Sequence, residues 1–269
     1  MDLIDSHIHM YARTTDDYER MALSGVVAVS EPAFWAGHDR SPAAFRDYFH
    51  ALTEWEPTRA ARYGIDHHCW VCINSKEAED LGKSREVMAL LPGFLPHARV
   101  LGVGEIGLNK NTPNEITVFQ EQVEIALQHD TLILVHTPHL EDKLKGTRIL
   151  VDLLRGDSRI QPHRVVIDHC EEHTVRLALD AGFWAGLTLY PTTKVTPQRA
   201  ADIIEVHGPE RILVNSSADW GPSDPLSVHR TALELRRRGH PGSLIRRVVH
   251  DNPDQFLGQS PSWRAGRGR

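Results

Sequence analysis

Histidine and carboxylate side chains recur along this chain at the points where short apolar runs end. Six of them stand out: His7, His9, Glu105, His136, His169 and Asp219. His7 and His9 are two residues apart, so both side chains point to the same side of an extended segment. Imidazole nitrogens and carboxylate oxygens suit divalent cations such as Zn²⁺, Mn²⁺, Fe²⁺, Co²⁺ or Mg²⁺. The sequence therefore predicts a site for one or two divalent metal ions per chain.

Six candidate ligands exceed the number that one tetrahedral ion takes, so two ions that share a carboxylate are expected, with Glu105 as the natural bridge. A centre of this kind activates water for hydrolysis. We expect Asp219 to bind the metal weakly and to accept the proton of that water. His136 and His169 would hold the second ion or contact the leaving group, and Asp168 would orient the ligands. The alternative is a barrel with polar strand ends and no metal.

The elements that must position these residues can also be predicted from the sequence. Eight short apolar, β-branched or aromatic runs are candidate strands: residues 3–5, 26–29, 68–73, 100–103, 132–135, 165–167, 183–189 and 212–214. Amphipathic segments lie between them, and two begin with a capping residue and a proline, at Ser41-Pro42 and Thr196-Pro197. Eight alternating strands and helices in 269 residues imply an α/β fold, a closed TIM (β/α)8 barrel.

Such a barrel carries its chemistry at the C-terminal ends of the strands, which is where the six candidate ligands fall. The alternative, an open doubly wound sheet, would usually have a glycine-rich phosphate loop after its first strand. This chain has Ser6-His7-Ile8-His9 there instead. We expect one barrel domain over residues 1–258 and a disordered basic tail over residues 259–269.

The charge of the chain limits its partners. The net charge of −6 lacks the basic surplus of a nonspecific nucleic-acid binder, so a small-molecule substrate is favoured over nucleic acid. No apolar run approaches the length of a membrane span and no signal-peptide pattern is present, so a cytoplasmic location is expected. Cys69 and Cys72 form a C-x-x-C pair, but they fall within a predicted strand and no second pair completes a zinc site. The oligomeric state cannot be predicted.

Five segments of the chain, in order, resemble the TatD family of metal-dependent hydrolases within the amidohydrolase superfamily. They read Asp5-Ser6-His7-Ile8-His9, Gly104-Glu105-Ile106-Gly107-Leu108, Val135-His136-Thr137, Asp168-His169-Cys170 and Ser217-Ala218-Asp219-Trp220. The second is the most specific, because relatives outside this group often place a carbamylated lysine on the fourth strand. The resemblance covers almost the whole chain and implies a divalent metal centre with a water-derived nucleophile. It also implies hydrolysis of an ester, amide, lactone or phosphoester bond.

The resemblance is incomplete around the predicted pocket. Asp219 lies two residues further past the eighth strand than the family pattern expects, an offset that a longer strand or a bulge would absorb. The segments that begin at Glu31 and at Cys170 also differ from the family pattern. The metal-binding residues are thus kept while the substrate-facing loops differ, which weakens any transfer of the family's nuclease activity.

Five further residues on predicted loops or near strand three are candidates for substrate contact: His67, His68, Lys110, Tyr190 and Trp220. Each has an alternative interpretation as an ordinary loop side chain, because position on a loop is a weak argument for function. Two other functions also stay open. One is a metal-dependent decarboxylase or isomerase of the same superfamily, which would need an arginine-lined pocket for a carboxylate. The other is a barrel that serves as a non-enzymatic scaffold.

Overall fold

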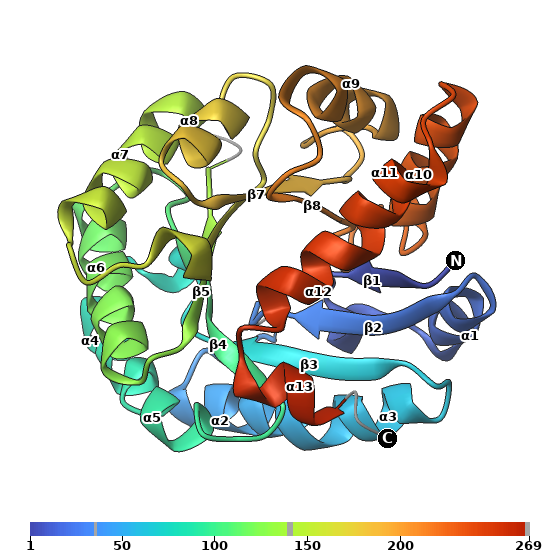
Figure 1. Cartoon of the computed structure of the whole chain (residues 1–269). Coiled ribbons are helices and arrows are strands. Elements are labelled where there is room, and N and C mark those ends of the chain that lie inside the picture. Colours follow the sequence, from blue (N-terminus) through green and yellow to red (C-terminus); the bar gives the residue numbers. More distant parts are fainter. Residues whose placement is uncertain (35–36, 139–141, 267–269) are drawn as a thin grey trace.

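The computed structural model describes residues 1–34, 37–138 and 142–266 and contains one eight-stranded sheet. Its strands are β1 (Leu3–Asp5), β2 (Val26–Glu31), β3 (Asp66–Val71), β4 (Val100–Gly107), β5 (Leu132–His136), β6 (Val165–Asp168), β7 (Trp184–Thr188) and β8 (Ile212–Asn215). Every strand pairs in parallel with the next one along the chain, and together they curve into a near-closed barrel (Figure 1). The predicted TIM barrel with eight strands is confirmed.

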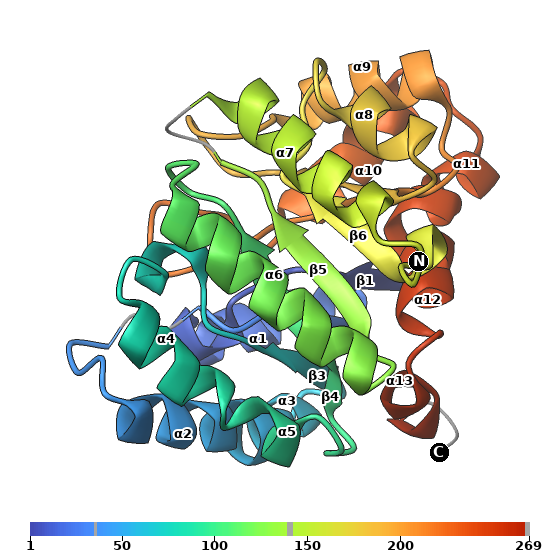
Figure 2. The same ribbon diagram turned by 90° about the vertical axis from the view of Figure 1, so that its left-hand side faces the viewer.

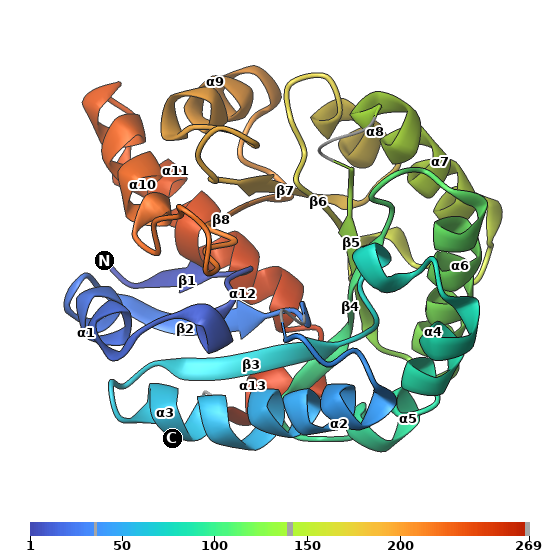
Figure 3. The ribbon, with the colours of Figure 1, turned by 180° about the vertical axis from the view of Figure 1, so that it is seen from behind.

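Most of the helices form a ring outside the strands, whereas the last two in the chain lie across one end of the barrel (Figures 2 and 3). The helices are α1 (Thr15–Leu23), α2 (Pro42–His50), α3 (Glu56–Ala61), α4 (Leu81–Met88), α5 (Leu91–Phe94), α6 (Pro113–Gln128), α7 (Lys143–Gly156), α8 (Val175–Asp180), α9 (Pro197–His207), α10 (Ser227–Arg237), α11 (Gly242–Arg246), α12 (Asn252–Leu257) and α13 (Pro261–Gly266). The Ser41 and Thr196 side chains cap α2 and α9 as predicted, each accepting a backbone N–H three residues on. In the described part of the chain, no helix combines the length and the apolar character that a bilayer crossing requires.

Capping also fixes the start of the long helix before β5. This helix, α6, begins at Pro113. Thr112 accepts a hydrogen bond from the backbone N–H of Glu115, and the Glu115 carboxylate accepts one from the backbone N–H of Thr112. This reciprocal pair satisfies the first free donors of the helix and fixes its start.

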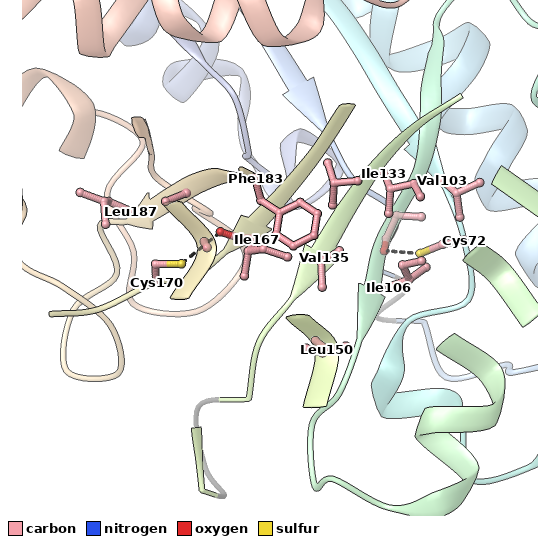
Figure 4. Packing of buried hydrophobic residues seen from close by; sticks show 14 of the residues in the cluster. Cys72, Val103, Ile106, Ile133, Val135, Leu150, Ile167, Cys170, Phe183 and Leu187 are labelled. Atoms are coloured by element: carbon pink, nitrogen blue, oxygen red, sulfur yellow. Dashed lines mark hydrogen bonds between the residues drawn. The ribbon is translucent and has the colours of Figure 1, made fainter. Parts of the chain in front are cut away.

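The outward faces of the strands pack against the helices in a continuous apolar layer. Figure 4 shows part of it, where Val135 of β5 and Ile167 of β6 lie near Leu150 of α7. The Cys170 thiol in this layer donates to the carbonyl oxygen of Ile167, 3.2 Å away. Cys72 is likewise buried here, and burial raises its thiol pKa well above the usual range. These cysteines are therefore packing residues with no exposed thiolate.

The seam between β8 and β1 is joined at its C-terminal end by hydrogen bonds beyond the strands themselves. Ser217 N–H donates to the carbonyl oxygen of His7 at 2.7 Å, and His9 N–H donates to the carbonyl oxygen of Ala218 at 2.9 Å. The Asp5 carboxylate accepts the N–H of Ser216 at 3.1 Å. The segments that follow the first and last strands thus hold each other in place.

At the opposite end of the barrel, the C-terminal helices form a floor. Figures 1 and 3 show α12 across the gap between β8 and β1, and both strands contact it. Phe256 and Trp263 from α12 and α13 pack inside the barrel against Trp70 and Trp184. The expectation of a disordered tail over residues 259–269 is wrong for residues 259–266, because the Trp263 ring is buried and its indole N–H donates to Asp254. Residues 267–269 lie outside the described residues.

This floor generates a stability prediction. Trp263→Ala should lower the free energy of unfolding by about 3–5 kcal/mol, because a large ring leaves a cavity inside the barrel. Trp55→Ala is the matched control, since that ring is 58% exposed and its removal should cost about 1 kcal/mol or less. Urea unfolding followed by circular dichroism measures both. Equal effects of the two substitutions would mean that the floor does not support the barrel.

Candidate metal centre

Five of the six predicted ligands meet at the C-terminal end of the barrel, and each is placed there by a strand. They are His7 and His9 after β1, Glu105 within β4, His136 at the end of β5 and His169 directly after β6. The pairing of β4 with β5 shifts register between Gly104 and Ile106. Such an irregularity can re-aim a side chain, and here it lies at Glu105. All five side chains are buried.

The Glu105 carboxylate lies between two pairs of histidines. Its Oε1 is 3.9 Å from His9 Nε2, which in turn is 3.1 Å from His7 Nε2. Its Oε2 is 2.9 Å from His136 Nδ1 and 3.3 Å from His169 Nε2, and these two nitrogens are 3.0 Å apart. The geometry therefore gives two sets of three donors that share one carboxylate, as a site for two cations would require.

Residues behind the histidines determine which ring nitrogen faces this centre. The Asp168 carboxylate is 2.5 Å from His7 Nδ1, so the other nitrogen, Nε2, is left to face His9 and Glu105. Thr188 Oγ1 lies 2.7 Å from His169 Nδ1 and also donates to Asp168. A carboxylate or hydroxyl that fixes a histidine in this way is typical of metal sites. Asp168 thus has the orienting role expected from the sequence.

A glycine on β7 makes room for this arrangement. A Cβ at Gly186 would lie 2.0 Å from Asp168 Oδ1, well inside contact distance. Asn215 of β8 donates to the same oxygen at 3.0 Å, so the Asp168 carboxylate is fixed by residues from both β7 and β8. The orientation of His7 at β1 consequently depends on β6, β7 and β8.

The protonation states of these groups suit cation binding. Burial, followed by the neighbouring His7, lowers the pKa of His9 to about 3, and burial lowers the pKa of His169 well below its usual range. Burial alone would raise the pKa of Glu105, but the adjacent His136 and His7 hold it well below the usual value. Neutral His9, His136 and His169 rings beside an ionised carboxylate are donors that Zn²⁺, Mn²⁺, Fe²⁺ and Co²⁺ accept. His7 differs, because the Glu105 and Asp168 carboxylates outweigh burial and raise its pKa, so this ring must release its proton when a cation binds. The residues present therefore fit a divalent metal.

The sixth predicted ligand, Asp219, is not within this cluster. β8 pairs with β7 in unbroken register up to Asn215, so no bulge absorbs the two-residue offset noted in the sequence. Ser217 instead lies beside the centre, with its Oγ 3.4 Å from His7 Nε2. Asp219 is half-buried in the adjoining wall, where its Oδ1 accepts from the Tyr190 hydroxyl at 2.9 Å and from Gly221 N–H at 2.7 Å.

The backbone at Asp219 is held by two residues that the sequence analysis did not identify. Arg13 donates to the carbonyl oxygen of Asp219 and forms a 2.8 Å ion pair with Asp17 of α1. Ser223 Oγ accepts the N–H of Asp219 at 3.0 Å. The carboxylate of Asp219 is therefore carried on a fixed turn. Because Arg13 is far from Asp219 in the sequence, no spacing pattern indicates this contact.

A cavity of about 190 Å³ opens onto the cluster and includes the side chains of several loops. Besides the candidate ligands, it is lined by Phe34, Lys76, Tyr190, Thr193, Lys194, Ser217 and Asp219. Among the five predicted substrate contacts, Tyr190 lines this cavity, and Trp220 stacks on Phe34 with ring centroids 5.0 Å apart. Lys110 is exposed and is not among the residues that line it.

His67 and His68 are also not at the cavity, which corrects the expectation that they contact substrate. β3 begins at Asp66, so both histidines lie in its first half, away from the C-terminal end. His67 Nε2 is 2.7 Å from the buried Glu31 carboxylate. His68 contacts Asp66 and packs on the Trp263 ring at the floor. Both side chains are buried and contact carboxylates in the N-terminal half of the strand, which is also where the predicted range 68–73 would place them.

The link between Asp168 and His7 can be tested directly. Asp168→Asn should weaken metal affinity by about 10–100-fold, because the amide cannot fix the His7 ring as the carboxylate does. Asp152→Asn, at an exposed position of α7, should leave metal affinity unchanged. Titration with Zn²⁺ or Mn²⁺ against a chelating indicator compares the variants. Parental affinity in the Asp168 variant would show that His7 needs no such support.

Comparison with known proteins agrees with this geometry. The family model for TatD-related DNases matches residues 4–234. An uncharacterised metal-dependent hydrolase from Methanocaldococcus jannaschii is 30% identical over 259 residues, covering 94% of this chain and 99% of that protein. The crystal structure of a TatD-like protein from Archaeoglobus fulgidus has a TM-score of 0.77 at 28% identity, over 95% of this chain and 99% of that one.

A more distant protein shares the fold alone. The phosphotriesterase of Mycobacterium tuberculosis has a TM-score of 0.69 at 11% identity, and the match covers 95% of this chain and 94% of that one. The family model covers most of the barrel, and the buried cluster supplies the donors that a metal-dependent enzyme needs. The chain therefore belongs to the TatD-related DNase family and is a metal-dependent hydrolase.

Proposed function

We propose that this enzyme hydrolyses an ester, amide, lactone or phosphoester bond of a small molecule with the help of one or two divalent cations. One observation carries the proposal: the Glu105 carboxylate lies among four histidines, with Oε1 facing His9 and with Oε2 facing His7, His136 and His169. When bound, a cation there would polarise the scissile group and lower the pKa of a water molecule. The candidate metals are Zn, Mn, Fe and Co, which the imidazoles and the carboxylate together suit, and Mg, which the carboxylate suits.

The residues around the centre have different roles in the proposed reaction. Glu105 holds the two halves of the site together, while Asp168 fixes His7. Asp219 is the general base of the proposal. Its Oδ1 already accepts hydrogen bonds from Tyr190 and Gly221, so the proton goes to Oδ2. The turn held by Arg13 keeps this carboxylate at the cavity wall.

The cavity supports a small-molecule substrate more than DNA. Its volume is about 190 Å³, and the chain has a net charge of −6. A decarboxylase or isomerase that binds a carboxylate through arginine is less favoured, since no arginine is among the residues that line the cavity in the described chain. A scaffold without activity is disfavoured by family membership together with the buried cluster.

Substitution of Glu105 tests the proposed function. Glu105→Gln should remove most bound metal and abolish hydrolysis, because an amide binds a divalent cation poorly in place of a bridging carboxylate. Glu86→Gln, an exposed change on α4, is the control that should retain both properties. Elemental analysis and a panel of phosphoester, lactone, ester and amide substrates give the readouts, with single-stranded DNA expected to be a poor substrate. Full activity without metal in the Glu105 variant would end the proposal.

The role of Asp219 has its own test. Asp219→Asn should keep the fold and the metal but lower turnover by about 10²–10⁴-fold, the usual contribution of a general base. Asp224→Asn is the comparison, because the Asp224 carboxylate pairs with Arg230 and the N–H of Leu226 outside the cavity lining. Turnover and metal content are measured on both variants. Loss of metal from the Asp219 variant would make this residue a ligand, and full turnover would place the base elsewhere.

A further inference from the structure

Two lysines face the cavity from opposite sides of the barrel mouth. Lys76 lies in the short helical turn after β3, and Lys194 lies in the segment after β7. The Lys76 ammonium is 4.6 Å from the centroid of the Phe34 ring, and the Lys194 ammonium is 5.3 Å from that of Tyr190. These aromatic contacts hold both long side chains at the cavity wall. Neither lysine is needed for the metal-binding geometry described above.

Neither ammonium group forms an ion pair with a carboxylate within the described residues. The contrast with Lys143 is informative. That buried lysine is 3.4 Å from Glu171 and donates to the carbonyl oxygen of His169 at 2.7 Å. Lys194 is half-buried at the cavity wall, and burial lowers its pKa to about 8. Its ammonium is partly removed from water and has no carboxylate partner in the described chain, so an anionic ligand beside it would offset the cost of its charge.

The carboxylates near Lys194 are already engaged. Glu105 is surrounded by histidines, Asp168 contacts His7, and Asp219 accepts from Tyr190. One bound divalent cation and the two lysines together carry four positive charges, whereas these three carboxylates carry three negative charges. A second cation would make the excess of positive charge larger. The loaded cavity is therefore positive although the whole chain is negative. Local charge of this kind attracts and retains anions.

We propose that Lys194 and Lys76 bind the phosphate group of a phosphate monoester beside the metal centre, which makes phosphate monoesters the substrate class of this enzyme. The inference rests on the hydrolase function proposed above and narrows it. A dianionic tetrahedral group presents three terminal oxygens, enough to face the centre and both ammonium groups at once. Lysine binds phosphate as a point charge, and arginine, whose planar group makes two-pronged contacts with carboxylates and phosphates alike, is absent from the described residues that line the cavity.

The rest of the substrate has an aromatic surface to pack against. Phe34 lines the cavity, lies 5.3 Å from the His9 ring, and stacks on Trp220 with an interplanar angle of 13°. Trp220 remains 50% exposed, so this pair extends from the centre to the solvent. A planar or apolar group joined to the phosphate would cover these rings. Phenyl phosphate therefore models the whole substrate better than inorganic phosphate does.

Equilibrium binding tests the proposal without any need for turnover. The probe is inorganic phosphate, titrated calorimetrically into the Mn²⁺-loaded protein at low ionic strength. Lys194→Met and Lys76→Met should each weaken phosphate binding by roughly tenfold or more, with metal content unchanged. Lys110→Met is the matched control, because this exposed lysine lies outside the cavity lining and should have no effect. Trp220→Ala should remove any preference for phenyl phosphate over phosphate.

Each outcome of these measurements either supports or overturns the proposal. Unchanged phosphate affinity in both lysine variants would overturn it, and so would tighter binding of succinate than of phosphate through the same lysines. Lysine-dependent phosphate binding together with hydrolysis of phenyl phosphate, but not of lactones or amides, would support the substrate class. Lysine-dependent binding without hydrolysis of any substrate would overturn the hydrolase function while leaving the anion site intact. Metal content, measured on every variant, keeps these cases apart.

Discussion

A buried carboxylate with histidines on both sides is the interaction on which this active centre depends. Glu105 would be costly to ionise at a buried position, and the adjacent His136 and His7 compensate that cost. Asn74 adds a hydrogen bond to Oε1 at 3.2 Å, and the Cys72 thiol donates to the backbone carbonyl of the same residue. These contacts come from β5 and from the segments that follow β1 and β3. The carboxylate thus joins the N-terminal and C-terminal halves of the barrel.

The metal-binding residues and the residues that line the rest of the cavity come from different parts of the fold. His136 ends a strand, and Glu105 lies within one, so their positions follow from the barrel itself. Phe34, Lys76 and Lys194 lie on segments that follow β2, β3 and β7, where the chain can change without altering strand pairing. This division explains how one fold supports different substrates, since binding residues lie on loops that a rigid scaffold positions.

The sequence was sufficient to predict the frame, because strands alternate with helices and parallel strands end on one face. That logic located His7, His9, Glu105, His136 and His169 correctly at the mouth of the barrel. It failed for candidates whose place along a strand or a turn keeps them from the mouth. His67 and His68 lie in the N-terminal half of β3, at the far end from the centre, and the tight turn after β8 puts Ser217 nearer than Asp219 to the centre.

Long-range contacts were beyond the same logic. The sequence gives no periodic pattern for Arg13 at the Asp219 turn, because the two residues are brought together only by the closed barrel. Trp263 was missed for a similar reason, since its burial requires the interior of the barrel to exist first. In both cases a residue near one end of the chain contacts a segment that is distant from it in the sequence.

The hydrogen bonds that join the two ends of the sheet have a consequence for how the enzyme is made. His7 and His9 are among the first residues synthesised, yet their backbone is fixed by Ser217 and Ala218, which are among the later ones. During synthesis the early histidines have no partner strand on that side until the eighth strand leaves the ribosome. Domains fold as units during translation, so the catalytic cluster is assembled only when the sheet closes. A truncated chain that stops before β8 carries most of the donor residues but cannot arrange them into the centre.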